Sequence, residues 1–178
     1  LSNPLGAYVL MGIEPELDSA DSAAAAKAMR GARFVAALTA YRTEAMEAYA
    51  DVLLPIAPFA ETSGSYVSME GKWQSFTGAV TPPGDARPAW KVLRVLGNLL
   101  DVDGFDYMDS AEVLADARAA CEGIGPETGV WGESSSGPSR NGAVDGLQRL
   151  GEVPLYGVDP LVRRARSLQQ TRDARFDG

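Results

Sequence analysis

The first third of the chain alternates short apolar runs with stretches that favour helix. An alanine-rich helix is expected after the first run, with Ser19 as its N-cap and Gly31 just beyond its end. A shorter helix, capped by Thr43 and ending at Tyr49, is expected after the second. The runs read as buried strands at residues 7–13 (AYVLMGI), 33–39 (RFVAALT) and 51–54 (DVLL). This order predicts an α/β fold, a small parallel sheet with flanking helices.

After Pro55 the pattern changes to short strands rich in aromatic and β-branched residues. Residues 65–69 and 72–76 flank the pair Glu70-Gly71. Glycine readily adopts the positive φ that a tight turn requires. The sequence therefore predicts a β-hairpin that follows the parallel sheet.

Two amphipathic helices are predicted next. The first runs from Ala89 to Asp101, and we expect its largest side chain, Trp90, to be buried. Its apolar face comprises Trp90, Leu93, Leu96 or Gly97, and Leu100. The second begins at an N-cap Ser110 and runs to Glu122. Its apolar side comprises Val113, Leu114, Ala117 and Cys121. Cys121 is therefore expected to be a small buried hydrophobic residue.

The remainder of the chain has a different composition. Residues 124–146 are rich in Gly and Ser and are expected to be a mobile linker, the first place for proteolysis, with Trp131 as an apolar anchor. A last helix is predicted from the N-cap Asp159 through residue 170. We therefore divide the chain into an α/β part with hairpin (1–80), a helical part (81–123), and a linker with an extended C-terminal tail (124–178).

Two scarce residue types exclude several kinds of chemistry. The chain has no histidine, which excludes a Ser–His triad and a histidine-ligated zinc. Its single cysteine cannot hold an iron–sulfur cluster or form an internal disulfide. No apolar run is long enough to span a membrane. The chain begins at Leu1 without a signal-peptide pattern, and we expect it to be part of a longer protein.

The net charge of −8 is unevenly distributed. Residues 97–133 hold nine acidic residues and one basic residue, whereas residues 151–178 hold five arginines and four acidic residues. An acidic chain is a poor partner for nucleic acid, whose phosphates attract Lys and Arg. The basic cluster of Arg163, Arg164 and Arg166 is consistent with a solvated helix face or with docking on an acidic surface.

Known ligand motifs do not fit the candidate stretches. The first strand–helix unit lacks both GxGxxG and GxxxxGK[ST], which argues against a nucleotide site. A calcium loop starting at Asp101 would place Glu112 correctly at its last position. It would also place Asp106 where glycine is required and Phe105 where an oxygen ligand is required. We therefore interpret this acidic stretch as a solvated helix end.

Glu61 and Glu70 are candidates for a pair of acid–base carboxylates. Their spacing alone does not place them in one pocket. The alternative is structural: Glu61 caps a turn, and Glu70 occupies a polar position of the hairpin.

The segment ADVLLPIAPFAETSGSYVSMEGKWQ at residues 50–74 resembles a motif of the molybdopterin oxidoreductase superfamily. The matching residues are Ala50, Asp51, Val52, Leu54, Pro55, Glu61, Gly64, Glu70, Gly71 and Gln74. Three positions depart from the usual pattern: Ser65 replaces Thr, Ser68 replaces Asn and Lys72 replaces Arg. The preceding strand–helix–strand segment is similar to the α/β domain of that superfamily.

Three further segments resemble the C-terminal part of one family within it, the large iron–sulfur subunits of bacterial proton-translocating NADH:quinone oxidoreductase (complex I). They are GIEPELDSAD, PPGDARPAWKVLRVLGNLL and GEVPLYGVDPLVRRARSLQQT. The resemblance implies a non-catalytic part of an electron-transport enzyme with no cofactor of its own and iron–sulfur clusters upstream. It also implies other hydrophilic-arm subunits as partners, NADH and quinone only through the whole complex, and a peripheral position on the cytoplasmic side of the inner membrane.

The alternative is the cofactor-binding part of a molybdopterin-dependent oxidoreductase such as a formate dehydrogenase. On that reading Glu70, Lys72 and Gln74 would contact the cofactor. Lysine at position 72 cannot offer phosphate the planar, bidentate fork of arginine. The barrel domain that closes over the cofactor in the molybdenum enzymes would be replaced here by the linker and a short helix. Both departures favour a scaffold, with no catalytic, cofactor-binding or metal residue in this chain.

Overall fold

The computed structural model describes residues 5–124 and 155–174. It separates into two compact units, Leu1–Pro126 and Glu127–Gly178. The expected linker at 124–146 and its anchor Trp131 lie outside the described residues, apart from Ile124. The three-part division expected from the sequence therefore stays a prediction.

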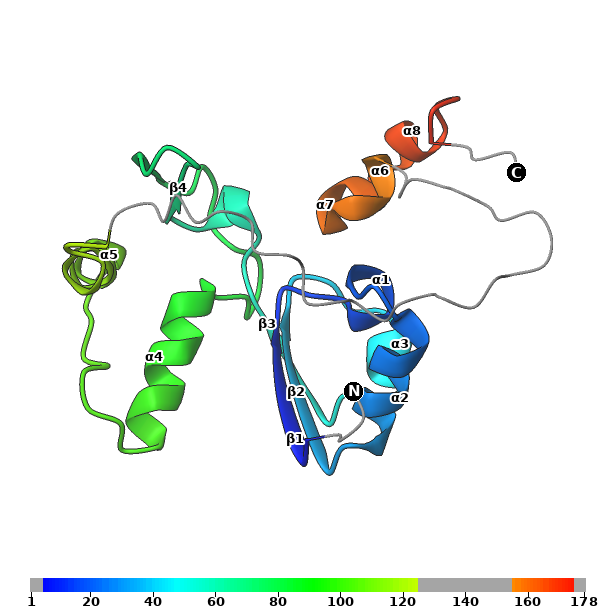
Figure 1. Cartoon of the computed structure of the whole chain (residues 1–178), viewed down its shortest axis with the longest axis horizontal. Coiled ribbons are helices and arrows are strands. Elements are labelled where there is room, and N and C mark those ends of the chain that lie inside the picture. Colours follow the sequence, from blue (N-terminus) through cyan, green and yellow to red (C-terminus); the bar gives the residue numbers. More distant parts are fainter. Residues whose placement is uncertain (1–4, 125–154, 175–178) are drawn as a thin grey trace, which may run out of the picture. The chain divides into compact units, whose positions relative to one another are not determined.

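The predicted α/β class is confirmed by a three-stranded parallel sheet in the order β1-β2-β3. Its strands are β1 (Ala7–Met11), β2 (Phe34–Thr39) and β3 (Val52–Pro55). The connecting helices are α1 (Pro15–Asp18), α2 (Ser22–Gly31) and α3 (Glu44–Glu47), and all three lie on one face of the sheet (Figure 1). Alternate strand side chains point to opposite faces, so half of the apolar strand residues face these helices.

The main core lies between the sheet and these helices. Leu10, Val35 and Ala37 from the sheet pack with Ala28 and Met29 of α2. Half-buried residues of the sheet and of the segments beside the helices complete the cluster: Tyr8, Ala32, Tyr49, Ala50 and Leu53. Val35 and Ala37 are each only 1% exposed, so the central strand is the best-protected part of this core.

Two expected features of the first helices are wrong. The N-cap of α2 is Asp21, whose carboxylate accepts a hydrogen bond from the Ala24 N–H at 2.9 Å, and not Ser19. Gly31 is the last residue of the helix, where its neighbour Ala32 is the C-cap. Thr43 does cap α3, which is shorter than predicted and ends before Tyr49. The short helix α1 was not foreseen.

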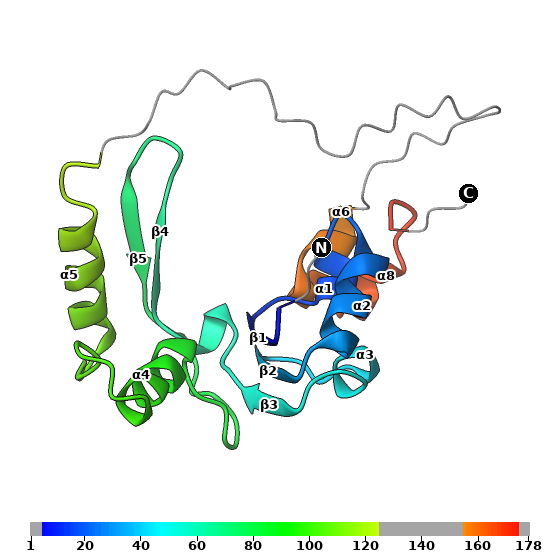
Figure 2. The same ribbon diagram turned by 60° about the horizontal axis from the view of Figure 1, so that its bottom comes forward.

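Two chain segments run beside each other between the sheet and the hairpin. Ile56 and Arg87 form a parallel bridge, and the Ala57 N–H donates to the Arg87 carbonyl at 2.9 Å. Further on, the Ala60 carbonyl accepts from the Ala79 N–H at 2.8 Å. The 3₁₀ turn η1 (Phe59–Glu61) leads from this paired stem into the hairpin. The chain thus enters and leaves the hairpin at one place (Figure 2).

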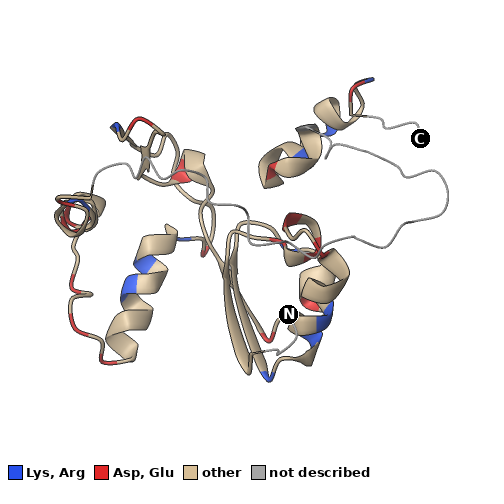
Figure 3. Ribbon diagram, in the orientation of Figure 1, with Lys and Arg blue, Asp and Glu red and all other residues tan. Residues whose placement is uncertain are grey.

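The predicted hairpin is present as β4 (Gly64–Val67) and β5 (Trp73–Phe76), an antiparallel pair. Two helices follow, α4 (Ala89–Leu99) and α5 (Ser110–Ala120), each ending slightly earlier than predicted. Asp109 caps α5 by accepting from two backbone N–H groups, which corrects the expectation for Ser110. Acidic residues line the connection between α4 and α5 (Figure 3), in agreement with a solvated segment.

The burial of these two helices differs from the prediction. Trp90 is half-buried, and Leu100 is 64% exposed. Gly97 is the buried residue of α4 because the Phe105 ring lies against it. Cys121 is exposed at the C-cap of α5, beyond the part of the helix where Val113 and Leu114 of the same side are half-buried.

The second unit is described over residues 155–174. Its helices are α6 (Leu155–Val158), α7 (Pro160–Arg163) and α8 (Arg166–Gln169). Asp159 caps α7 as predicted, but the expected continuous helix is broken at Ala165, whose backbone is extended. Gln169 donates to the carbonyls of Tyr156 and Val162, each at 2.9 Å, which ties the three turns together.

Candidate functional site

The β4–β5 hairpin carries the residues singled out as candidate cofactor contacts. Its turn is closed by Ser68 and Lys72. The Ser68 N–H donates to the Lys72 carbonyl at 3.0 Å, and the Lys72 N–H donates to the Ser68 hydroxyl at 3.1 Å. Gly71 has a φ of +77°, which an L side chain rarely adopts. Ser68 and Gly71 are therefore required by the turn itself.

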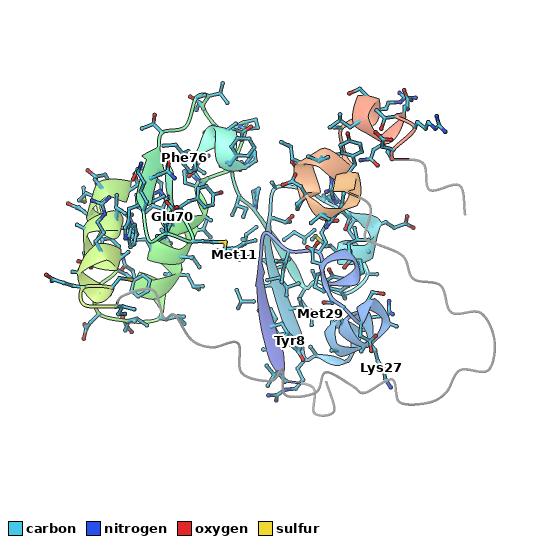
Figure 4. The ribbon with its side chains drawn as sticks, turned by 45° about the horizontal axis from the view of Figure 1, so that its top comes forward. Tyr8, Met11, Lys27, Met29, Glu70 and Phe76 are labelled. Carbon is cyan, nitrogen blue, oxygen red and sulfur yellow. The ribbon has the colours of Figure 1, made fainter. Side chains whose placement is uncertain are left out.

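The three candidate side chains do not converge. Glu70, Lys72 and Gln74 are all exposed, and Glu70 lies in the turn at the tip of the hairpin (Figure 4). Gln74 pairs with Tyr66 across the strands. The three side chains form no hydrogen bond or ion pair with the described residues. None of them lines a cavity described below.

Other motif residues have clear roles in the fold. Asp51 accepts a hydrogen bond from the Val35 N–H at 2.7 Å, and its own N–H donates to the Val35 carbonyl at 2.9 Å. This reciprocal pair fixes the start of β3 against β2. Gly64 lies under the Phe76 ring, where an added Cβ would be 2.6 Å from the nearest ring atom. The same ring stacks on Tyr66 with centroids 5.7 Å apart.

A cavity of about 440 Å³ lies between one face of the hairpin, the start of α4, and α5. Its lining combines aromatic and aliphatic side chains, chiefly Trp73, Trp90, Val113, Leu114 and Ala117, with the hydroxyls of Ser63, Ser65, Ser75, Thr77 and Ser110. The Arg118 guanidinium lies 5.5 Å from the centre of the Trp73 ring. This contact joins α5 to the hairpin.

A second cavity of about 380 Å³ shares Ser63, Trp90 and Ser110 with the first and has more polar walls. Glu61 lines it, and the Glu61 Oε2 atom is buried without a hydrogen-bond partner among the described residues. Glu61 lies at the base of the hairpin and Glu70 at its tip. The two carboxylates therefore do not form an acid–base pair. The Glu61 N–H, rather than its side chain, closes the preceding turn by donating to the Pro58 carbonyl at 2.9 Å.

A third cavity, of about 310 Å³, lies where β2 and β3 end, the edge at which open α/β sheets usually bind ligands. Its polar lining includes Thr39, Tyr41 and Arg42. The Thr39 hydroxyl already forms hydrogen bonds with the backbone of Tyr41, and Arg42 forms an ion pair with Glu47. Sequence reasoning missed this cavity, because Thr39 and Arg42 belong to no spaced motif. The position of Thr39 at a strand end was the available signal.

Two tyrosines have shifted proton affinities. Burial, reinforced by the Glu16 carboxylate that accepts its hydrogen bond at 3.1 Å, raises the pKa of Tyr49. A 2.6 Å hydrogen bond to Asp116 raises the pKa of Tyr107. Both hydroxyls are thus held as donors to carboxylates. This arrangement stabilises local structure and makes neither tyrosine a base.

In the basic cluster, two guanidinium groups bind backbone carbonyls of their own unit. Arg163 donates from Nη2 to the Val158 carbonyl at 3.0 Å, and Arg164 donates from Nη1 to the Pro160 carbonyl at 2.8 Å. The Arg163 contact joins α6 to α7, and the Arg164 contact links the C-cap of α7 to the first residue of that helix. Docking of the cluster on an acidic partner stays a prediction.

The described residues offer few groups that could hold a metal or cofactor. They contain no cluster of three or more acidic or cysteine side chains arranged around a metal position. The hairpin residues that would contact a pterin cofactor are dispersed on an exposed surface. They therefore do not by themselves fit such a group. Among the helices described, none is long and apolar enough to cross a bilayer.

Comparisons with known proteins find two kinds of curated relative. Over 53 residues, 30% of its length, the chain is 45% identical to the "NADH-ubiquinone oxidoreductase 78 kDa subunit, mitochondrial" of Candida albicans. Over 66 residues, 37% of its length, it is 35% identical to a "Putative formate dehydrogenase" of Staphylococcus aureus strain MRSA252. The chain spans about 7% of the length of these curated relatives.

A family model described as molybdopterin oxidoreductase matches residues 1–99, which include the parallel sheet, the hairpin and α4. Since this match covers more than half of the 178 residues, the chain belongs to the molybdopterin oxidoreductase family.

Proposed function

We propose that this chain is a non-catalytic C-terminal part of the large iron–sulfur subunit of a proton-translocating NADH:quinone oxidoreductase. In this role it supports the hydrophilic arm beside the electron path, on the cytoplasmic side of the bacterial inner membrane. Its partners are the other subunits of that arm. NADH and quinone are encountered only by the whole complex, and the iron–sulfur clusters belong to a different part of the parent subunit.

The proposal depends chiefly on how the fold uses the family motif. Asp51 binds the β2 backbone, Ser68 and Gly71 form the hairpin turn, and Gly64 makes room for an aromatic ring. Each of these roles is structural and needs no ligand. The motif can therefore persist in a chain that binds no cofactor.

The charge of the hairpin supports the same proposal. A pterin cofactor carries phosphate, which is best bound by arginine side chains and converging backbone N–H groups. The hairpin offers Lys72 beside Glu70, whose carboxylate repels phosphate. The similarity to the 78 kDa subunit, at 45% identity, also favours the complex I reading.

A second candidate is the cofactor-binding part of a molybdopterin-dependent oxidoreductase such as a formate dehydrogenase. The observation in its favour is the longer match, 66 residues, to the Staphylococcus aureus protein. On this reading Glu70, Lys72 and Gln74 face a cofactor held mainly by another part of the parent protein.

The two candidates are distinguished by purifying the native assembly that contains this chain. We expect NADH-to-quinone electron transfer, co-purification of hydrophilic-arm subunits, and no stoichiometric molybdenum by elemental analysis. Lys72→Ala and Gln74→Ala should leave the metal content and the activity unchanged. Stoichiometric molybdenum that is lost in Lys72→Ala but kept in Ser65→Ala, a control on the opposite hairpin face, would reject the scaffold proposal.

A further inference from the structure

Two neighbouring cavities in the first unit differ in the chemistry of their walls. The first, of about 440 Å³, lies where the hairpin runs beside α5 and meets the start of α4 (Figure 2). The second, of about 380 Å³, lies at the base of the hairpin. Ser63, Trp90 and Ser110 line both, so the two cavities adjoin. We call the first the aromatic cavity and the second the acidic cavity.

The aromatic cavity suits an uncharged body that contains a ring. Among the described residues that line it, none carries a charge. Trp73 and Trp90 contribute two indole rings, and Val113 and Leu114 contribute aliphatic side chains. Aromatic side chains make favourable stacked or edge-to-face contacts with other rings. Pockets for small molecules usually combine such walls with a few polar groups, here serine and threonine hydroxyls, at volumes of about 300–1,000 Å³.

The acidic cavity contains a carboxylate that lacks a partner. Its charged lining residues are Glu61, Lys91 and Asp109. Asp109 already accepts hydrogen bonds from two N–H groups of α5, and the Lys91 ammonium lies 5.4 Å from the centre of the Trp90 ring. Glu61 forms no ion pair with a described residue, and its Oε2 atom is buried without a hydrogen-bond partner among them. Because an unpaired buried acceptor is unfavourable, a cationic donor at Glu61 would be stabilised.

We propose that the two cavities bind a small organic cation that carries an aromatic ring, an arylalkylamine or arylalkylguanidine. Its ring packs against Trp73 and Trp90, and its charged head donates to the Glu61 carboxylate. The net charge of −8 attracts cations and repels anions. A lysine or arginine side chain of another protein has no ring to fill the aromatic cavity, so a free small molecule fits better. This site is independent of the complex I proposal and of the hairpin residues that would contact a pterin.

The test is isothermal titration calorimetry of the full-length protein that contains this chain, with phenethylamine as the probe. Phenethyl alcohol has the same ring without the charge, and butylamine has the charge without the ring. We expect each of these two to bind at least about tenfold more weakly than phenethylamine, because each loses one of the two interactions. The proposal is overturned if phenethylamine does not bind or if phenethyl alcohol binds as tightly. It is also overturned if butylamine binds as tightly, since the site would then fit a lysine side chain.

Substitutions in each cavity locate the binding. Glu61→Gln keeps the size of the side chain and removes its charge, so it should weaken phenethylamine binding at least about tenfold and leave phenethyl alcohol binding unchanged. Ala117→Phe fills the aromatic cavity and should abolish phenethylamine binding. Ala119→Phe is the matched control, because Ala119 is exposed on the opposite side of α5 and does not line the cavity. Circular dichroism melting curves confirm that the variants are folded. Unchanged binding in Glu61→Gln, or equal loss in Ala117→Phe and Ala119→Phe, would reject the proposal.

Discussion

Gly97→Ala should destabilise the protein although alanine is the better helix former. Gly97 lies inside α4, where replacing glycine by alanine normally gains about 0.5–1 kcal/mol. The added Cβ would lie 2.3 Å from the Phe105 ring, against 3.4 Å for an ordinary contact. The ring would have to move by about 1 Å, and such overpacking costs about 1–3 kcal/mol. The expected net loss is about 1–2 kcal/mol.

The assay is urea unfolding followed by tryptophan fluorescence and circular dichroism. Asn98→Ala is the matched control, because Asn98 is exposed on the same helix and should gain about 0.5 kcal/mol from propensity alone. Adding Phe105→Leu to Gly97→Ala should recover part of the loss, since the smaller side chain can withdraw from the new methyl group. If Gly97→Ala stabilises the protein as much as Asn98→Ala does, the packing of Phe105 on α4 is incorrect.

Further predictions concern one hydrogen bond, one helix cap and one ionisation. Asp51→Ala should cost about 1–2 kcal/mol in denaturant unfolding by removing the acceptor for the Val35 N–H, whereas Asp51→Asn keeps an acceptor oxygen and should cost less. Asp109→Ala should cost about 1 kcal/mol and Ser110→Ala much less, and the reverse order would assign the cap to Ser110. Since the folded pKa of Tyr49 is raised above its ordinary 10.0, its contribution to stability is complete below that pH and is lost as the unfolded chain ionises above it. A pH series of unfolding free energies for Tyr49→Phe should therefore fall less steeply above pH 10.0 than the unsubstituted series, and equal slopes would contradict the shift.

The parallel sheet could be predicted because its three apolar runs can be recognised in the sequence without knowledge of the tertiary fold. The helix caps were harder. Asp21 and Asp109 each have a serine on one side and a further capping candidate nearby, and the preferences of Asp and Ser as N-caps are nearly equal. Only the backbone conformation at the helix start distinguishes them. The caps at Thr43 and Asp159 were predicted correctly because no competing residue adjoins them.

The orientation of α4 and the cavity beside the hairpin could not be predicted from the sequence, because both depend on tertiary contacts. Because α4 is apolar on two sides, periodicity alone could not show that Gly97 is buried and Leu100 is exposed. The hairpin and its positive-φ glycine were found from turn chemistry. The cavity between Trp73, Trp90 and α5 joins segments more than fifteen residues apart in sequence, and no local pattern indicated it.

Residues 61–78 leave the rest of the fold and return to it at one place, the paired stem beneath the hairpin. The Ala60 carbonyl accepts a hydrogen bond from the Ala79 N–H at 2.8 Å, so the two ends of this segment lie next to each other. The entropic cost of closing a loop depends on the length of the loop and on the separation of its ends. Replacing the hairpin by a short turn would therefore add no such cost to formation of the sheet. Length and sequence changes in the hairpin are therefore thermodynamically decoupled from the parallel sheet. A chain of this architecture can lose or alter its hairpin chemistry while its α/β core stays intact.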